Sequence, residues 1–319
     1  MKIAALVPVY NAEMYLRECL DSILAQTFSD VTVFCCDDGS VDGSMRILED
    51  YAAKTSRVRF VTQENRGVVA ARNRLMDELP PEFEAFAFVD SDDFIAPGMY
   101  AKLAEAMERT GADVAECGMP GHAVERERIV DDMSVYLLRR TAPGPWINVV
   151  NKLYRRTAVG TVRFREGLRF EEDFFFNYEV NAAINRKVLV PGVYYTYRDN
   201  PDSATHALDQ RRYFDSTARR VRLSLEVFLR AGRLPKEIEP AWLAELSKDA
   251  YRMCIRKNLK RNRDAEERRA LFREAGGLLA ALECEFGFRP VGLNPIQRLI
   301  WGCCRRNRSA VASLLVYLT

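Results

Sequence analysis

The chain has 319 residues, and 48% of them are hydrophobic, which excludes a mainly disordered protein and predicts a substantial core. The formal net charge of +2 hides an asymmetry. Residues 1–204 carry 24 Lys and Arg against 32 Asp and Glu, whereas residues 205–319 carry 23 against 13. An acidic first part suits a metal-dependent site, and a basic second part suits contact with phosphate, an anionic membrane surface or the acidic part of the same molecule. We expect no nucleic-acid partner.

The first 118 residues alternate between strand-like and helix-like runs. Short apolar runs predict strands, and apolar residues at a spacing of three and four predict helices. The predicted strands are 3–9, 31–36, 58–62, 85–89 and 114–117, and the predicted helices are 16–24, 44–53, 68–79 and 97–109. Successive strand–helix units predict an α/β fold with a mostly parallel sheet.

The rest of the chain is less regular. Residues 118–142 lose clear periodicity, which fits a long loop or strands over the site, and residues 188–197 read as a strand. Helices are then predicted at 213–230, 240–259 and 264–286. This pattern predicts two domains, an α/β domain at 1–204 and a helical, basic region at 205–319.

Cysteine and histidine usage bears on metal content and compartment. The eight cysteines form no CxxC pair, and with two histidines no zinc spacing can be assembled. We therefore expect reduced thiols in a cytoplasmic protein. The start of the chain does not resemble a signal peptide, and no apolar run is long enough to span a bilayer.

Polar clusters follow three of the predicted strands. They are Tyr10-Asn11 after the first strand, Asp37 to Ser40 after the second and Asp90 to Asp93 after the fourth. Because the carboxyl ends of parallel strands gather at one edge of a sheet, we expect these clusters to form one ligand site. The alternative for each cluster is a cap for the following helix.

The three carboxylates of Asp90-Ser91-Asp92-Asp93 form an unfavourable group in the absence of a cation. Like charges a few ångströms apart repel one another, so a metal, or donors aimed at the site, would have to neutralise them. A hard divalent cation together with a bound diphosphate would satisfy this requirement.

Several motifs occur in one order along the first 200 residues. Together they resemble family 2 glycosyltransferases of the GT-A fold. The matching segments are Val7-Pro8-Val9-Tyr10-Asn11, Cys36-Asp37-Asp38-Gly39-Ser40, Glu64-Asn65-Arg66-Gly67, Ala71-Arg72-Asn73, Asp90-Ser91-Asp92-Asp93, Asn151-Lys152-Leu153-Tyr154 and Glu172-Asp173.

The resemblance implies a donor site for a nucleotide sugar, most simply a UDP-sugar. Asp38 would accept the ring N–H of uracil, and Tyr10 would stack on the base beside the extended backbone at Pro8. Arg72 would bind phosphate oxygens, and Gly67 would allow close approach of an anion. The remaining residues assigned to the donor site are Asn11, Asn65, Ser91 and Lys152.

Four of these residues could instead have an ordinary structural role without a ligand. Tyr10 could be a half-buried ring at a strand end, and Arg72 could be a solvent-facing helix residue. Gly67 could be a simple turn glycine, and Lys152, which the resemblance lets reach a phosphate or the acceptor, could equally lie on the surface.

The resemblance also implies a metal site and a general base. Asp92 and Asp90 would bind Mg²⁺ or Mn²⁺ together with the donor diphosphate, and Asp173 would remove the acceptor proton. Glu171 and Glu172 would raise the pKa of Asp173 by repulsion. The alternative for these acids is an acidic helix start, and the spacing from Asp173 to Asn177 favours Asp173 as the base. A direct displacement would invert the anomeric carbon.

The acceptor implied is a hydroxyl of a glycan or of a lipid-linked glycan, as in cell-surface polysaccharide synthesis. The basic segment 299–318 resembles a membrane-surface element, which would place the protein on the inner face of the membrane; the alternative is a terminal helix docked on the core. The sequence leaves open whether the protein forms a homo-oligomer.

Three other functions compete with this one. A non-catalytic nucleotide-sugar or glycan-binding protein would share the fold. A sugar-nucleotide pyrophosphorylase would need a glycine-rich basic loop where this chain has Pro8 to Asn11, and a dinucleotide-dependent dehydrogenase would need a GxGxxG motif after the first strand.

Overall fold

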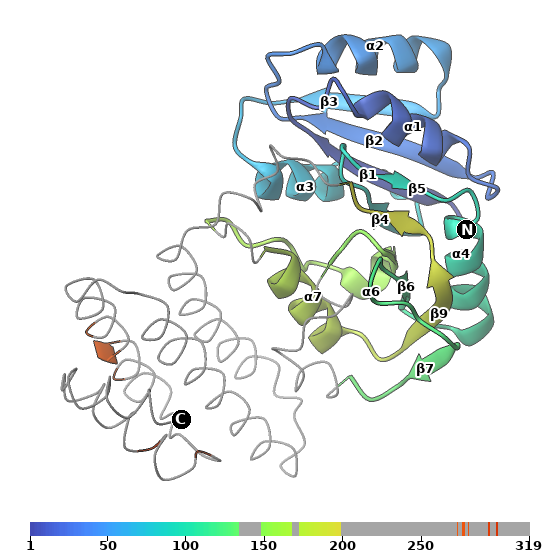
Figure 1. Cartoon of the computed structure of the whole chain (residues 1–319), viewed down its shortest axis with the longest axis vertical. Coiled ribbons are helices and arrows are strands. Elements are labelled where there is room, and N and C mark those ends of the chain that lie inside the picture. Colours follow the sequence, from blue (N-terminus) through green and yellow to red (C-terminus); the bar gives the residue numbers. More distant parts are fainter. Residues whose placement is uncertain are drawn as a thin grey trace. The chain divides into compact units, whose positions relative to one another are not determined.

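A computed structural model describes residues 1–133, 148–167 and 172–198, and six single residues beyond them: 273, 276, 277, 280, 293 and 298. The described residues up to 198 belong to one compact unit, drawn in colour in Figure 1. The predicted helices at 213–230, 240–259 and 264–286 and the basic segment 299–318 fall essentially outside the described residues. The domain boundary at 204 therefore stays a prediction.

The first half of this unit consists of strand–helix repeats. Its strands are β1 (Ile3–Val9), β2 (Val31–Asp37), β3 (Val58–Thr62) and β4 (Ala85–Phe88). The helices are α1 (Leu16–Leu24), α2 (Ser44–Lys54), α3 (Val68–Asp77) and α4 (Met99–Thr110). Both β1 and β4 are buried throughout, because helices cover both faces of this part of the sheet.

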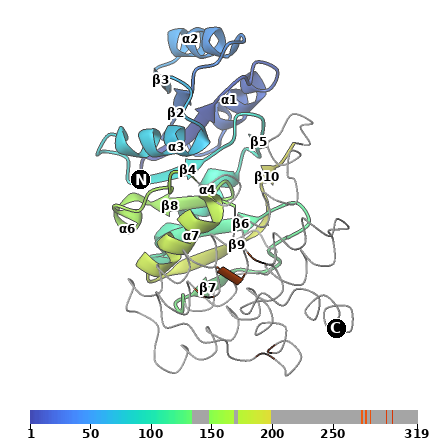
Figure 2. The same cartoon turned by 90° about the vertical axis from the view of Figure 1, so that its left-hand side faces the viewer.

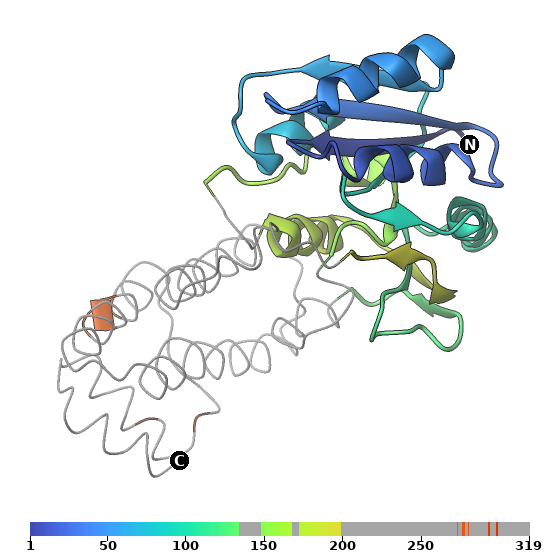
Figure 3. The same ribbon diagram turned by 45° about the horizontal axis from the view of Figure 1, so that its top comes forward.

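The second half adds strands that return to the same sheet. They are β6 (Val114–Gly118), β7 (Arg128–Val130), β8 (Lys152–Arg155) and β9 (Lys187–Val193), with the helices α6 (Arg156–Val159) and α7 (Glu172–Ala183). A separate two-stranded sheet pairs β5 (Phe94–Ile95) with β10 (Tyr195–Thr196). Helix α4 packs against β6 and β9 and is seen nearly end-on in Figure 3.

The eight-stranded sheet has the order β3-β2-β1-β4-β8-β6-β9-β7, and in Figure 2 all of these strands except β1 are labelled, from β3 at the top to β7 at the bottom. Strands β1 to β4 run parallel, as do β6 and β9, whereas β8 and β7 run antiparallel to their neighbours. The order reverses at β1, since β2 follows on one side and β4 on the other. Ligands of such sheets bind at this reversal, beyond the carboxyl ends of the strands.

Pro8 lies in β1 without breaking the sheet. Strand β1 pairs with β2 over its whole length, but it pairs with β4 only from Ile3 to Leu6. Pro8 has no N–H to donate, and it lies where β1 has already lost one of its neighbours. The fully buried ring extends the backbone toward Tyr10, the first residue after the strand.

The predicted strands and helices of the first 118 residues are confirmed with small shifts at their ends. The strand predicted at 188–197 is wrong as a single element, because it divides into β9 and β10, with the left-handed Gly192 (φ 104°) near the end of β9. Strand β8 was not predicted as a strand at all. Among the residues that the structure describes, no helix combines the length and apolar character needed to cross a membrane.

Candidate active site

The loops after β1 and β2 are tied together by Asn11. Its backbone N–H donates to Ser40 Oγ (3.0 Å), and its side-chain oxygen accepts from the N–H of Val41 (2.9 Å). Asn11 has a positive φ of 49°, which asparagine tolerates better than most residues. Beside it, the ring of Tyr10 is 50% exposed and could stack on a planar ligand.

Asp38 organises the loop between β3 and α3. Its carboxylate accepts hydrogen bonds from Gln63 Nε2 (2.7 Å) and from the N–H groups of Arg66 (2.9 Å) and Gly67 (2.7 Å). A carboxylate offers about four acceptor sites, so these three donors leave capacity for one more, although Asp38 is only 3% exposed. Gly67 has a φ of 88° and a ψ of 163°, a conformation reserved for glycine. Its N–H binds Asp38, and the expectation that the missing side chain allows close approach of an anion stays a prediction.

Gly39 permits the contact between these loops. It has a φ of 75°, and a Cβ added there would lie 2.9 Å from the backbone nitrogen of Asn65. The Gly39→Ala variant is therefore expected to lower the free energy of unfolding by about 1–3 kcal/mol, the usual cost of such strain. Gly98→Ala is the control, because Gly98 has a φ of −92° and open space around it, and there we expect at most about 1 kcal/mol. Urea denaturation measures both variants, and equal losses would contradict the argument.

The Asp90 to Asp93 loop divides its acids between two roles. Asp93 is 1% exposed and accepts from Tyr195 Oη (2.6 Å) and from the N–H of Arg198 (2.8 Å). Burial and repulsion from Asp90 raise the pKa of Asp93 to about 7. Asp90 and Asp92 are partly exposed instead. Asp93 thus anchors the loop, and Asp90 and Asp92 remain as candidate metal ligands.

The helix-cap alternative for this loop is wrong. Helix α4 begins at Met99 with Gly98 as its N-cap, and no side chain caps it. The loop is held instead by Arg198, whose guanidinium donates to the carbonyl of Asp92 (3.0 Å) and to Glu18. In the described part of the chain, no group of three or more His, Cys, Asp or Glu is arranged to hold a metal ion. A metal at Asp90 and Asp92 would need oxygens from its substrate to complete its shell.

Arg72 is a buried cation among partly exposed acids, and the solvent-facing alternative is wrong. The residue is 3% exposed, and its guanidinium binds Asp173 Oδ1 through Nη1 (2.6 Å) and Asp90 Oδ1 through Nη2 (2.8 Å). Its planar group also lies over the ring of Phe164, 5.3 Å from the centroid. Both terminal nitrogens are thus engaged by carboxylates. In this structure the guanidinium is occupied by protein acids, and the expectation that Arg72 binds donor phosphate stays a prediction.

Asp173 and Glu172 open helix α7. Burial raises the pKa of Asp173, Arg72 opposes that shift, and Asp90 adds to it. The pKa of Glu172 is also raised, mainly by burial and secondly by repulsion from Asp173. Glu172 Oε1 lies 3.9 Å from Arg72, and the buried Oε2 of Glu172 has no hydrogen-bond partner. The raised pKa of Asp173 was expected, but burial is its largest cause. Glu171 lies outside the described residues.

Lys152 does not lie on the surface, and its assignment to a phosphate or the acceptor stays a prediction. It is fully buried in the sheet, where it binds the carbonyl of Asn148, the side-chain oxygen of Asn151 (2.8 Å) and Glu116 Oε2 (3.6 Å). Glu116 also binds Lys187 (3.0 Å). Glu116 and Lys187 were not among the site residues predicted from sequence. A glutamate inside the apolar strand 114–117 was a signal, because a buried carboxylate requires a cationic partner.

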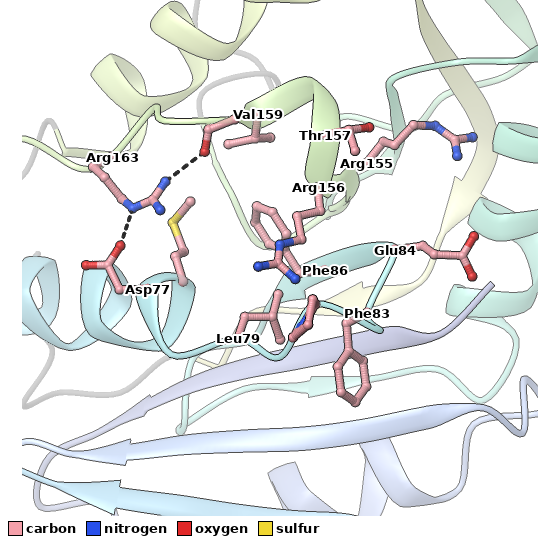
Figure 4. A pocket seen from close by; sticks show the side chains of 13 residues that line it. Asp77, Leu79, Phe83, Glu84, Phe86, Arg155, Arg156, Thr157, Val159 and Arg163 are labelled. Carbon is pink, nitrogen blue, oxygen red and sulfur yellow. Dashed lines mark hydrogen bonds and ion pairs between the residues drawn. The ribbon is translucent and has the colours of Figure 1, made fainter.

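A cavity of about 590 Å³ lies away from these residues, and Figure 4 shows its lining. It is at the amino end of β4, near Glu84 and Phe86, whereas the acids above follow the carboxyl end. Two of its arginines are held by protein groups, Arg156 by the Pro80 carbonyl (2.7 Å) and Arg163 by Asp77 (2.7 Å). None of the site residues predicted from sequence lines it. We therefore place the candidate active site at the carboxyl edge of the sheet.

Comparison with known proteins identifies the family of this chain. Residues 4–190 match the family model for glycosyl transferase family 2. The uncharacterized glycosyltransferase EpsJ of Bacillus subtilis is 31% identical over 217 residues, which cover 64% of this chain and 62% of EpsJ. The chain thus spans less than two thirds of the length of this relative.

Two solved structures share the fold. Residues 1–349 of S. aureus TarS in complex with UDP-GlcNAc superpose with a TM-score of 0.78 at 21% identity, covering 99% of this chain and 91% of that one. The mannosyltransferase PcManGT from Pyrobaculum calidifontis, in complex with GDP-Man and Mn²⁺, gives a TM-score of 0.51 at 17% identity, covering 98% and 87%. The GT-A resemblance seen in the sequence is confirmed. Since the family model matches more than half of the chain, the chain belongs to glycosyl transferase family 2.

Proposed function

We propose that the protein is a metal-dependent, inverting glycosyltransferase that transfers a sugar from a UDP-sugar to a hydroxyl of a glycan or lipid-linked glycan. The observation that carries this proposal is the position of Asp173. Its partly exposed carboxylate and that of Asp90 are bridged by the buried Arg72, beyond the carboxyl end of β4. The site thus combines a base of raised pKa with acids suited to a metal.

Recognition of the nucleotide is assigned to the loops after β1 and β2. The exposed ring of Tyr10 offers a stacking surface, and Asp38 keeps one acceptor site for the ring N–H of uracil. The exposed side chain of Asn65 lies on the loop that Asp38 holds. The UDP-GlcNAc bound to the related fold of TarS supports a UDP-sugar as donor.

Asp90 and Asp92 suit a hard divalent cation, Mg²⁺ or Mn²⁺, because both offer partly exposed carboxylate oxygens on one loop. Ser91 lies between them on the same loop. When bound, such a cation supplies charge stabilisation to the departing diphosphate. The protein's own contribution is to fix the loop, which Arg198 and Tyr195 do through Asp92 and Asp93. Mn²⁺ in the distant neighbour PcManGT supports this proposal.

Asp173 is the proposed general base, and it removes the proton from the acceptor hydroxyl. Arg72 and the N–H of Val149 each donate to one of its carboxylate oxygens. Each oxygen keeps further lone-pair capacity for the incoming hydroxyl. With base and leaving group on opposite faces of the sugar, a single displacement inverts the anomeric carbon.

A panel of donors tests this function. Thermal denaturation with UDP-GlcNAc, UDP-glucose, UDP-galactose and GDP-mannose, each with and without Mn²⁺, is expected to show stabilisation by a UDP-sugar that depends on the metal. A donor at a hundred times its Kd should stabilise by about 2.7 kcal/mol. The Asp92→Asn variant should lose most of the metal-dependent part. No shift with any UDP-sugar would refute the donor assignment, and stabilisation without turnover would support a binding protein instead.

A further inference from the structure

The orientation of Asp173 depends on a short segment of the chain that precedes β8. The N–H of Val149 donates to Asp173 Oδ2 (3.3 Å), whereas Arg72 binds Oδ1 (2.6 Å). The two donors approach from different elements, so the carboxylate is fixed at both oxygens. If residues 148 and 149 moved, the hydrogen bond to Oδ2 would be lost first.

Two buried side chains hold the peptide that joins Asn148 to Val149. Lys152 Nζ and Asn177 Nδ2 (3.1 Å) both donate to the carbonyl of Asn148, which belongs to the same peptide unit as the N–H of Val149. Tyr154 Oη in turn donates to Asn177 Oδ1 (2.8 Å) and so orients the amide. Lys152 is fully buried and Asn177 is almost so. A planar peptide held at its carbonyl presents its N–H in a fixed direction.

The charge of Lys152 is not required to neutralise Glu116. Glu116 already binds Lys187 at 3.0 Å, closer than its 3.6 Å to Lys152. Burial lowers the pKa of Lys152 to about 8, against the attraction of Glu116. A second buried ammonium costs desolvation energy, and an apolar side chain of similar size would avoid that cost. Lys152 is still mainly protonated at pH 7, and it uses its donors on Asn148 and Asn151.

We propose that Lys152 and Asn177 are positioning residues for the base: by holding the carbonyl of Asn148 they direct the N–H of Val149 onto Asp173. This inference rests on the proposed function, in which Asp173 is the general base. Under this proposal, two of the sequence motifs share the task of orienting Asp173. They are Asn151-Lys152-Leu153-Tyr154 and the helical turn from Asp173 to Asn177. The side chains of Lys152 and Asn177 are both buried, so in this proposal they act through Asp173.

The test compares Lys152→Met with Lys187→Met. Both variants remove one ammonium from the same buried pair of lysines and leave Glu116 with one cationic partner. Lys187 lies on β9, on the far side of β6 from β8. Lys152→Met is expected to lower kcat about 10- to 100-fold with the KM for the donor unchanged within about twofold, because small displacements of a catalytic group cost this much. Lys187→Met should keep kcat within about threefold. The readout is nucleoside diphosphate release from the donor turned over fastest in the panel above.

A second measurement separates positioning from general stability. In an Asp173→Asn background, Lys152→Met should lower the residual rate less than twofold, because the group through which it acts is already absent. Asn177→Leu should behave in the same way, and it replaces Lys152→Met if that variant does not fold. The inference is overturned if the rate falls by the same factor with and without Asp173, or if Lys152→Met raises the donor KM instead of lowering kcat.

These outcomes can be told apart from failure of the proposed function. If Asp173→Asn itself keeps the full rate, Asp173 is not the base and the inference fails with it. If Asp173→Asn is slow but Lys152→Met and Asn177→Leu are as fast as Lys187→Met, only the positioning role is wrong.

Discussion

The Asp173→Asn variant is expected to lower kcat for sugar transfer between about a hundredfold and ten-thousandfold, the usual range for loss of a general base. The amide cannot accept the acceptor proton, yet it has almost the same volume as the carboxylate. Nucleotide recognition is assigned to loops after β1 and β2, so UDP binding in the presence of Mn²⁺ should stay within about threefold of wild type. Turnover and calorimetric titration with UDP measure the two effects separately.

Glu172→Gln is the matched control for this prediction. Glu172 precedes Asp173 on α7 and also has a raised pKa, but it lies 3.9 Å from Arg72, whereas Asp173 lies at 2.6 Å. We expect the Gln variant to lose at most about tenfold in kcat. If Glu172→Gln were the slower variant, the base would be Glu172. Loss of UDP binding in Asp173→Asn would undermine the assignment of a base role.

The sequence could predict the strand–helix repeats because their information is local. Residues 3–9, 31–37 and 85–88 are short apolar runs, and each is followed by polar residues and a helix with its apolar side at regular spacing. The positions of Tyr10, Asp38 and Asp90 at one edge then followed from the parallel topology alone. The starts of these helices could be placed to within a residue or two, because the apolar spacing that marks them is also local.

The partners of the charged residues could not be predicted, because they depend on contacts distant in sequence. Arg72 binds Asp173, which lies 101 residues further along the chain. Lys152 meets Glu116 only because β8 inserts antiparallel between β4 and β6, a placement without a sequence signal of its own. The motifs therefore placed these residues near one another, but they could not show that Arg72 pairs with Asp173 or that Lys152 is buried beside Glu116.

The largest effect on stability is expected from Arg72→Met, because this guanidinium neutralises three acids. Asp90 and Asp173 lie within 2.8 Å of it and Glu172 within 3.9 Å, and the side chain is almost fully buried. Removing one partner of a buried ion pair leaves uncompensated charge and typically costs about 3–5 kcal/mol. Because the three acids are 16–30% exposed, we expect the lower end of this range. Urea denaturation at pH 8 without added metal should show a loss of this size.

Arg74→Met is the control, since Arg74 lies two residues further on the same helix. It makes a partly exposed ion pair with Glu78 (2.8 Å), and such pairs contribute at most about 1 kcal/mol. We expect the Arg74 variant to lose no more than that. A similar loss in both variants would mean that the Arg72 cluster contributes no more than a surface pair.

The pH dependence of the Arg72→Met variant separates loss of charge balance from loss of packing. The pKa values of Asp173 and Glu172 are raised even beside Arg72, and without the cation they should rise further. A carboxyl whose pKa is higher in the folded state binds more protons when the protein is folded. The loss of folding stability that its charge causes is therefore absent below the ordinary pKa of about 4 and is complete once the pH has risen through the folded pKa. The stability difference from wild type should therefore be smaller at pH 5 than at pH 8. A difference independent of pH would assign the loss to the packing of the guanidinium on Phe164, because burial of an apolar contact does not titrate.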